Sequence, residues 1–161
     1  MRLRHEMEYA VSPVEVFEML ADPGFRESSC REQDAVSAEV RLDRKGDAFT
    51  LVVDQVQRTD DLPSVARRFV GATTRAVQHE EWTGPEQGAL RIETPGLPAD
   101  IHGTIILLAE GEGTREVVEL EIKVRIPVVG GRLESVLSDR IRTSLEGEHR
   151  AGVRWLEGDP A

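Results

Sequence analysis

Apolar and polar residues alternate along most of the first 126 positions, which is the pattern of strands that bury one face. The first such stretch spans residues 2–10, and one of its faces carries mostly charged side chains. The other face carries Leu3, His5, Met7 and Tyr9. The same alternation predicts further strands over residues 36–43, 49–56, 74–82, 89–94, 101–109 and 116–126. Turns rich in Gly and Pro separate most of these strands, so consecutive strands are expected to pair antiparallel.

Helix signals interrupt this alternation at three places. Ser12 is an N-cap residue, a proline follows it, and Glu15 completes a capping box, so a helix begins here and ends at residues 22–24 (Asp-Pro-Gly). Two more short helices are expected, over residues 25–32 and 63–69.

After residue 131 the apolar residues recur every three or four positions, which predicts one helix of about 25 residues. Its apolar stripe contains Leu133, Val136, Leu137, Ile141, Leu145, Gly152, Trp155 and Leu156. At 1.5 Å per residue such a helix is long enough to cross a sheet of ordinary width.

The order of elements predicts an α+β fold in one domain over residues 1–161. A curved antiparallel sheet of about seven strands needs a cover on its buried face. The long C-terminal helix is the only element large enough to supply that cover. A sheet that wraps around a helix leaves a concave space between them, and such spaces are the usual sites for small ligands.

The chain resembles a known superfamily in two features. One is this order of elements, and the other is the segment RIPVVGGRLE at residues 125–134, which joins the last strand to the long helix. The chain resembles the helix-grip (SRPBCC) superfamily of START lipid-transfer domains, polyketide cyclases and the birch-pollen allergen. More narrowly, residues 62–71 and the Trp155-Leu156 pair are similar to an uncharacterised, mostly actinobacterial family within it. The resemblance covers nearly the whole chain. It implies the helix-grip fold and an apolar ligand, such as a lipid, a sterol or a polyketide.

The amino-acid composition limits the classes of partner that the protein can bind. The net charge is -10, and basic residues are interleaved with acidic ones, so nucleic acid is excluded as a partner. The longest apolar run, residues 105–109, is far too short to cross a bilayer, and no membrane insertion is expected. The charged N-terminus lacks the apolar core of a signal peptide, which predicts a cytoplasmic protein. The sequence indicates no cofactor and leaves open whether the protein is a monomer or a homodimer.

Three residues are candidates for acid–base chemistry. His5 shares its strand face with Tyr9, so the two could lie together in the cavity. Alternatively, His5 is a strand-end histidine, half in water. Glu148 either tips into the cavity or ends the buried stripe of the helix and faces water; the cost of an unpaired buried carboxylate favours water. Beside a strand arginine such as Arg91, a buried Glu148 would anchor a ligand.

No motif predicts a metal site. In a strand, His79 and Glu81 point to one side while Glu80 and Trp82 point to the other. A third ligand such as His102 would have to arrive from a neighbouring strand, so a solvated strand face is the favoured interpretation. Cys30 is the only cysteine and is interpreted as a small, partly buried side chain.

The residues expected to contact a ligand come from the inner faces of two strands, from the join and from the long helix. They are Met7, Val118, Leu120, Ile122, Val124, Val128, Val129, Leu137, Ile141 and Leu145. Val128 and Val129 would lie at the cavity mouth as a lid. Ile126 is taken as the last inward residue of its strand, and Glu134 in the first helical turn disfavours a phosphate site there.

Three functions remain open. The favoured one is binding or carriage of an apolar, lipid-like or polyketide-like molecule, without catalysis. The second is a cyclase, dehydratase or hydrolase acting on such a molecule, which needs at least two polar groups converging in the cavity. The third is a non-catalytic interaction or stress-response module that works through its surface.

Overall fold

Residues 1–158 are described by a computed structural model, in which seven strands and four helices follow one another. The strands are β1 (Arg2–Tyr9), β2 (Ser37–Lys45), β3 (Ala48–Arg58), β4 (Thr73–Gly84), β5 (Gln87–Glu93), β6 (Ala99–Glu110) and β7 (Gly113–Val124). The helices are α1 (Pro13–Leu20), α2 (Pro23–Glu32), α3 (Ser64–Val70) and α4 (Gly130–Leu156).

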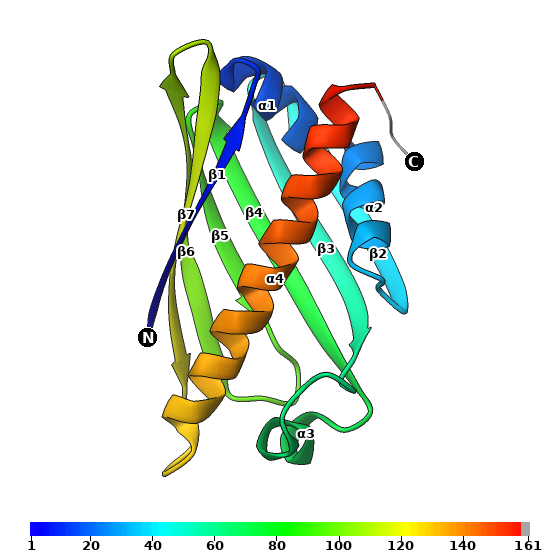
Figure 1. The fold of residues 1–161 in the computed structure, drawn as a ribbon, viewed down its shortest axis with the longest axis vertical. Coiled ribbons are helices and arrows are strands. Elements are labelled where there is room, and N and C mark those ends of the chain that lie inside the picture. Colours follow the sequence, from blue (N-terminus) through cyan, green and yellow to red (C-terminus); the bar gives the residue numbers. More distant parts are fainter. Residues whose placement is uncertain (159–161) are drawn as a thin grey trace.

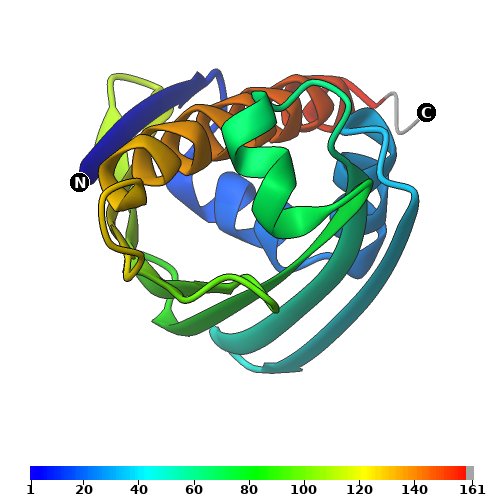
Figure 2. The ribbon, with the colours of Figure 1, turned by 90° about the horizontal axis from the view of Figure 1, so that it is seen from below.

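All seven strands form one antiparallel sheet in the order β1-β7-β6-β5-β4-β3-β2. Strands β2 to β7 make a meander, and β1 joins its far edge beside β7. The sheet curves into a trough, and α4 runs along its open side (Figure 1 and Figure 2). The predicted helix-grip architecture is therefore confirmed.

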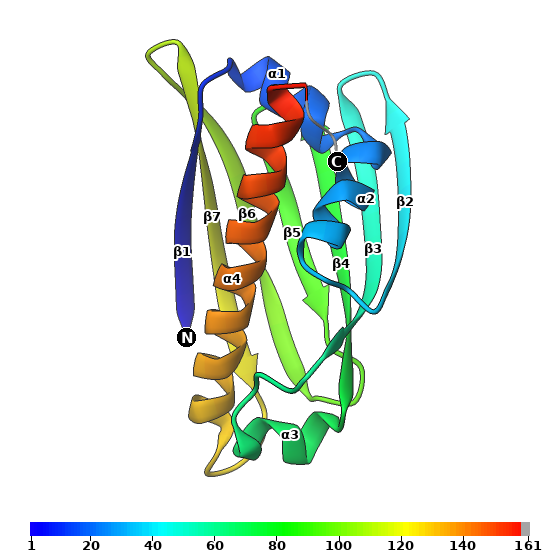
Figure 3. The same cartoon turned by 45° about the vertical axis from the view of Figure 1, so that its right-hand side comes forward.

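Helix α1 begins where its capping residues predict, whereas α2 begins at Pro23, inside the Asp-Pro-Gly stretch that was expected only to end the first helix. The Ser12 hydroxyl accepts a hydrogen bond from the Glu15 amide, and Asp22 caps α2 in the same way through the Gly24 amide. Figure 3 shows α2 beside the upper half of α4, between that helix and β2 at one edge of the sheet. Helix α1 lies across the upper end of the trough (Figure 1).

The corner between β7 and α4 differs from the expectation. Strand β7 ends at Val124 rather than at residue 126. Glu134 does not serve the helix N-terminus: its Oε2 accepts the backbone N–H of Val124 at 3.0 Å, and its Oε1 lies 3.5 Å from the chain's amino group. It therefore ties the end of β7 to α4. Gly130 is required here, because a Cβ would lie 2.7 Å from the Val124 carbonyl oxygen.

A small second core closes the lower end of the trough. Ala66 of α3 packs there with Val124 and Leu133, and Val129 joins them from the corner. Val128 is fully exposed, with a φ of 72° that β-branched residues rarely adopt. Of the two residues expected to form a lid, one is thus packed and the other points into solvent.

Candidate functional site

A cavity of about 110 Å³ lies between the concave face of the sheet and the middle of α4. One wall is aliphatic: β5 and β6 contribute Leu90, Ile92 and Ile101, and α4 contributes Leu137, Ile141 and Leu145. The space exceeds the volume that one water molecule needs, and this wall offers no polar partner to hold water. It is therefore suited to an apolar group.

Much of the remaining lining is polar and is called the polar wall below. It carries the amides of Gln33, Gln55, Gln57 and Gln78, together with Ser144 and Glu148. Sequence reasoning missed these four glutamines, because a glutamine on an alternating strand, as for Gln55, Gln57 and Gln78, or at a helix end, as for Gln33, looks like a solvent-facing residue. A molecule that fills the cavity would meet both aliphatic carbon and hydrogen-bonding groups.

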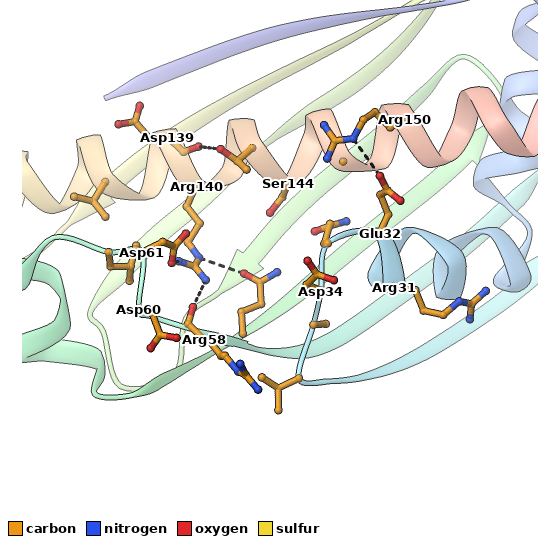
Figure 4. A pocket seen from close by; sticks show the side chains of 18 of the residues that line it. Arg31, Glu32, Asp34, Arg58, Asp60, Asp61, Asp139, Arg140, Ser144 and Arg150 are labelled. Atoms are coloured by element: carbon orange, nitrogen blue, oxygen red, sulfur yellow. Dashed lines mark hydrogen bonds and ion pairs between the residues drawn. The ribbon is translucent and has the colours of Figure 1, made fainter. Parts of the chain in front are cut away.

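An open, charged cleft of about 1210 Å³ lies outside this cavity, between α4, the end of α2 and the loop before α3 (Figure 4). Its lining includes Glu32, Asp34, Arg58 and Arg150. Cleft and cavity share four lining residues, which are Gln33, Gln57, Arg140 and Ser144. These four residues, called the neck below, lie where the cavity and the cleft meet.

Arg140 of α4 spans this neck. Its guanidinium donates to Gln57 Oε1 at 3.2 Å, to Asp61 Oδ1 at 3.1 Å and to the carbonyl of Arg58 at 2.6 Å. Figure 4 shows the side chain reaching from the helix to the strand end below it. It thus links α4 to the β3–α3 connection across the opening.

A buried ion pair lies behind the polar wall. Arg26 of α2 donates to both carboxylate oxygens of Glu80, at 3.1 and 2.9 Å, and its Nε donates to the Leu20 carbonyl at 2.8 Å. Glu80 Oε1 also accepts the indole N–H of Trp82 at 2.9 Å. Gln78, which lines the cavity, donates to the other oxygen of Glu80. A chain of polar contacts therefore runs from the cavity wall into the core.

Two further buried carboxyl groups lie near the Arg26–Glu80 ion pair. Glu148 Oε2 lies 3.7 Å from Arg26 Nη1, and Glu116 of β7 is completely buried nearby. Burial raises the pKa of Glu148, since the nearby Arg26 lowers it only in part and Glu80 raises it further. Burial raises the pKa of Glu116 well above its ordinary value, and Glu148 and Glu80 add to this effect. Both carboxyls are therefore held toward their neutral form.

Glu116 gives this cluster a measurable pH dependence. Its folded-state pKa lies above the ordinary value of 4.5, so folded chains hold a proton that unfolded chains release as the pH rises past 4.5. The stability that Glu116 contributes is fully present below that pH and is lost as the pH rises through its folded-state pKa. Glu116→Gln should therefore make the unfolding free energy fall less steeply between pH 4.5 and 8, as measured by urea denaturation.

A matched control is available on the same strand. Glu121 is exposed on the outer face of β7 and pairs with exposed Arg2, and Glu121→Gln should leave the slope unchanged. Equal slopes for the native chain and Glu116→Gln would show that Glu116 is ionised in the fold.

The three acid–base candidates lie in different surroundings. Tyr9 is buried with its hydroxyl unpaired among the described residues, and its ring lies edge-on to that of His149 with centroids 5.0 Å apart. Burial raises the pKa of Tyr9, helped by Glu116 and Glu148. His5 is half-buried at α4, where its Nδ1 lies 3.3 Å from Arg142 Nη1, and burial lowers its pKa. Neither residue lines the cavity.

The expectation that Glu148 faces water was wrong. The residue is 9% exposed, lines the cavity and pairs with Arg26 of α2 rather than with Arg91. Helix α2 carries that arginine beneath α4, so the cost of burying the carboxylate is reduced. A pairing partner 122 positions away along the chain leaves no local signal.

The expected ligand contacts divide into two groups. Leu137, Ile141 and Leu145 line the cavity. The remaining inward-facing strand residues are packed in the hydrophobic core or the small second core: Met7, Val118, Leu120, Ile122 and Val124. That these residues contact a ligand stays a prediction.

The other singled-out side chains have local partners. His79 Nε2 lies 2.8 Å from Glu93 Oε1, and His102 Nδ1 lies 3.2 Å from Asp100 Oδ1. Within residues 1–158, no group of three or more His, Cys, Asp or Glu side chains is arranged to hold a metal ion. Cys30 is buried, and burial with nearby Glu148 raises its pKa to about 11, so its thiolate is disfavoured at neutral pH. None of the described helices is both long and apolar enough to cross a membrane.

The chain has the helix-grip fold, which it shares with START domains. A START superfamily protein from Mycobacterium smegmatis superposes with a TM-score of 0.58 at 12% identity, covering 96% of this chain and 98% of that one. Truncated norcoclaurine synthase from Thalictrum flavum superposes with a TM-score of 0.60 at 12% identity, covering 97% and 92%. At these identities the likeness shows the fold alone.

Sequence comparison identifies the family. Residues 4–156 match the family described as "Protein of unknown function (DUF2505)", and the chain belongs to it. An uncharacterized protein of Mycobacterium tuberculosis, Rv0481c, is 26% identical over 119 residues, which cover 69% of this chain and 68% of that protein.

Proposed function

We propose that this protein binds and carries a small, largely apolar molecule in the cavity between the sheet and α4. The observation that carries the proposal is the aliphatic wall formed by β5, β6 and α4 around unfilled space. The fold is shared with a START superfamily protein and with norcoclaurine synthase, which supports the proposal without identifying the molecule. The outer cleft and its neck would be the entry path.

Binding is favoured over catalysis by what lines the cavity. Among its described lining residues, Glu148 is the only side chain with an ordinary pKa between 2 and 12; His, Cys, Tyr and Lys are absent from the wall. Acid–base catalysis on a polyketide-like or lipid substrate would need a second titrating group. A cyclase, dehydratase or hydrolase is therefore the weaker candidate.

The proposal is tested by solvent extraction and by titration. Mass spectrometry of an extract of purified protein should find one apolar compound in stoichiometric amount, or the empty protein should bind hexan-1-ol saturably at one site. With seven heavy atoms, a Kd of about 1 mM or tighter is expected from ligand-observed NMR. An extract without a ligand, together with non-saturable hexan-1-ol binding, would refute the proposal.

Arg140 should control the rate of entry. Arg140→Met removes three hydrogen bonds across the neck while retaining similar bulk on α4. We expect exchange of hexan-1-ol between the cavity and solvent, measured by NMR line shape, to become several-fold faster. The reason is that the hydrogen bonds from Arg140 to the β3–α3 connection must break before the ligand can pass between that connection and α4. The affinity should change by less than the exchange rate, since Arg140 forms only the edge of the cavity.

A control for this experiment lies on the rim of the outer cleft. Arg150 pairs with Glu32 there but does not line the cavity, so Arg150→Met should leave the exchange rate as it is. An unchanged rate in Arg140→Met would mean that the ligand enters elsewhere.

A further inference from the structure

The carboxyl group of Glu148 is aimed into the cavity without a hydrogen-bond partner. The residue is 91% buried and lines the cavity, and no described residue donates a hydrogen bond to it. Its nearest cationic group, Arg26 Nη1, lies at 3.7 Å, beyond hydrogen-bonding distance, and both terminal nitrogens of Arg26 already donate to Glu80. A buried carboxyl without a donor is costly and calls for a complementary group.

The surroundings of Glu148 are short of positive charge. Arg26 faces three buried carboxyl groups, which are Glu80 of β4, Glu116 of β7 and Glu148 itself. If all three were ionised, this part of the core would carry two uncompensated negative charges. Such a site is stabilised either by protons on the carboxyls or by a second cation.

The other charged groups on the cavity wall are already paired. Arg75 donates to Asp54 through two nitrogens, and Arg140 donates to Asp61. The remaining polar groups beside Glu148 are neutral, and Ser144 lies one helical turn before it on the same face of α4. Glu148 is therefore the one charge-bearing side chain of the wall without a hydrogen-bonded charge partner among the described residues, because the guanidinium of Arg26, 3.7 Å away, already donates to Glu80.

We propose that the ligand of this cavity carries a cationic amine, which Glu148 binds, while its apolar part lies against the aliphatic wall. This rests on the proposed function and names the chemical class of the ligand. An ammonium group at Glu148 would give the cluster its second positive charge, and neutral oxygens of Ser144 or the glutamines could accept its remaining N–H donors. The protein's net charge of -10 would also attract a cation toward the cleft.

Binding should be linked to the release of a proton. An alkylamine remains protonated up to a pKa of about 10, and Glu148 must ionise to pair with it. Because burial raises the pKa of Glu148, affinity for the amine should rise as the pH is raised from the ordinary carboxyl value of 4.5 toward 8. The titratable and charged groups that face Glu148 are Arg26 and Cys30 of α2, Tyr9 of β1, Glu80 of β4 and Glu116 of β7.

The test compares three ligands of the same chain length: hexylamine, hexan-1-ol and hexanoate. At pH 8 and 0.15 M salt, hexylamine should bind at least about tenfold more tightly than hexan-1-ol, with hexanoate weakest. Glu148→Gln, which preserves size and buries no charge, should abolish the preference for the amine and its pH dependence while still binding hexan-1-ol. Glu146→Gln, an exposed position on the same helix, should keep both.

The outcomes separate the two proposals. Equal binding of hexylamine and hexan-1-ol, or a preference that persists in Glu148→Gln, would overturn the amine assignment and leave the cavity's function standing. Saturable binding of neither molecule would overturn both.

Discussion

Arg26→Met should destabilise the protein by about 3–5 kcal/mol, because it leaves Glu80 buried without its charge partner. Glu80 would keep the hydrogen bonds from Trp82 and Gln78, but these neutral donors cannot replace a bidentate guanidinium. The change also removes the cation nearest to Glu148. Urea denaturation at pH 7 measures the loss.

Two further variants show whether the loss comes from the charge. In the double variant Arg26→Met/Glu80→Gln the buried charge is gone and the indole still has an acceptor, so more than half of the lost stability should return. Arg2→Met, which breaks an exposed pair with Glu121, should cost less than about 1 kcal/mol. A loss in Arg26→Met no larger than that in Arg2→Met would mean that this core does not depend on the buried pair.

Ala76→Phe should abolish ligand binding by filling the cavity. Ala76 lies on the inner face of β4 and lines the cavity, so a phenyl group there occupies the space that a ligand would take. Affinity for hexan-1-ol should fall at least about tenfold, while the unfolding free energy should change by only about 1–2 kcal/mol. Ligand-observed NMR and urea denaturation measure the two effects separately.

The control for Ala76→Phe is the same substitution on the opposite face of the sheet. Ala89 is exposed on β5, directly before the cavity residue Leu90, so Ala89→Phe adds the same ring outside the cavity. It should leave affinity unchanged. If both variants bind hexan-1-ol as the native chain does, the binding site is not this cavity.

The fold was predictable because alternation and capping are local properties of the sequence. Ser12 and Glu15 mark the start of α1, and the alternation of β7 shows its buried face. The end of β7 was not predictable, because it depends on Glu134 reaching back from α4 to the Val124 amide. The alternation of apolar and polar residues continues beyond the last paired residue of β7, so it gives no sign of this hydrogen bond.

The polar half of the site could not be read from the sequence, since it depends on contacts between distant elements. Arg26 lies on a helix of low apolar content, and only the docking of α2 against α4 and the sheet buries it. One local signal existed: Glu80 shares its strand face with Trp82, so an inward tryptophan implies an inward glutamate. Glu148 likewise followed Ser144 by one turn, but its burial required Arg26.

Chemical-shift mapping tests the central claim, a ligand site between the sheet and α4, most directly. In ¹H–¹⁵N spectra of the native protein titrated with hexan-1-ol, the amides of Leu90, Ile101, Leu137, Ile141 and Leu145 should shift together and saturate at one equivalent site. The same shifts should be absent in Ala76→Phe and present in Ala89→Phe. Shifts confined to the outer face of the sheet, or cavity amides that do not respond at saturating hexan-1-ol, would contradict the account.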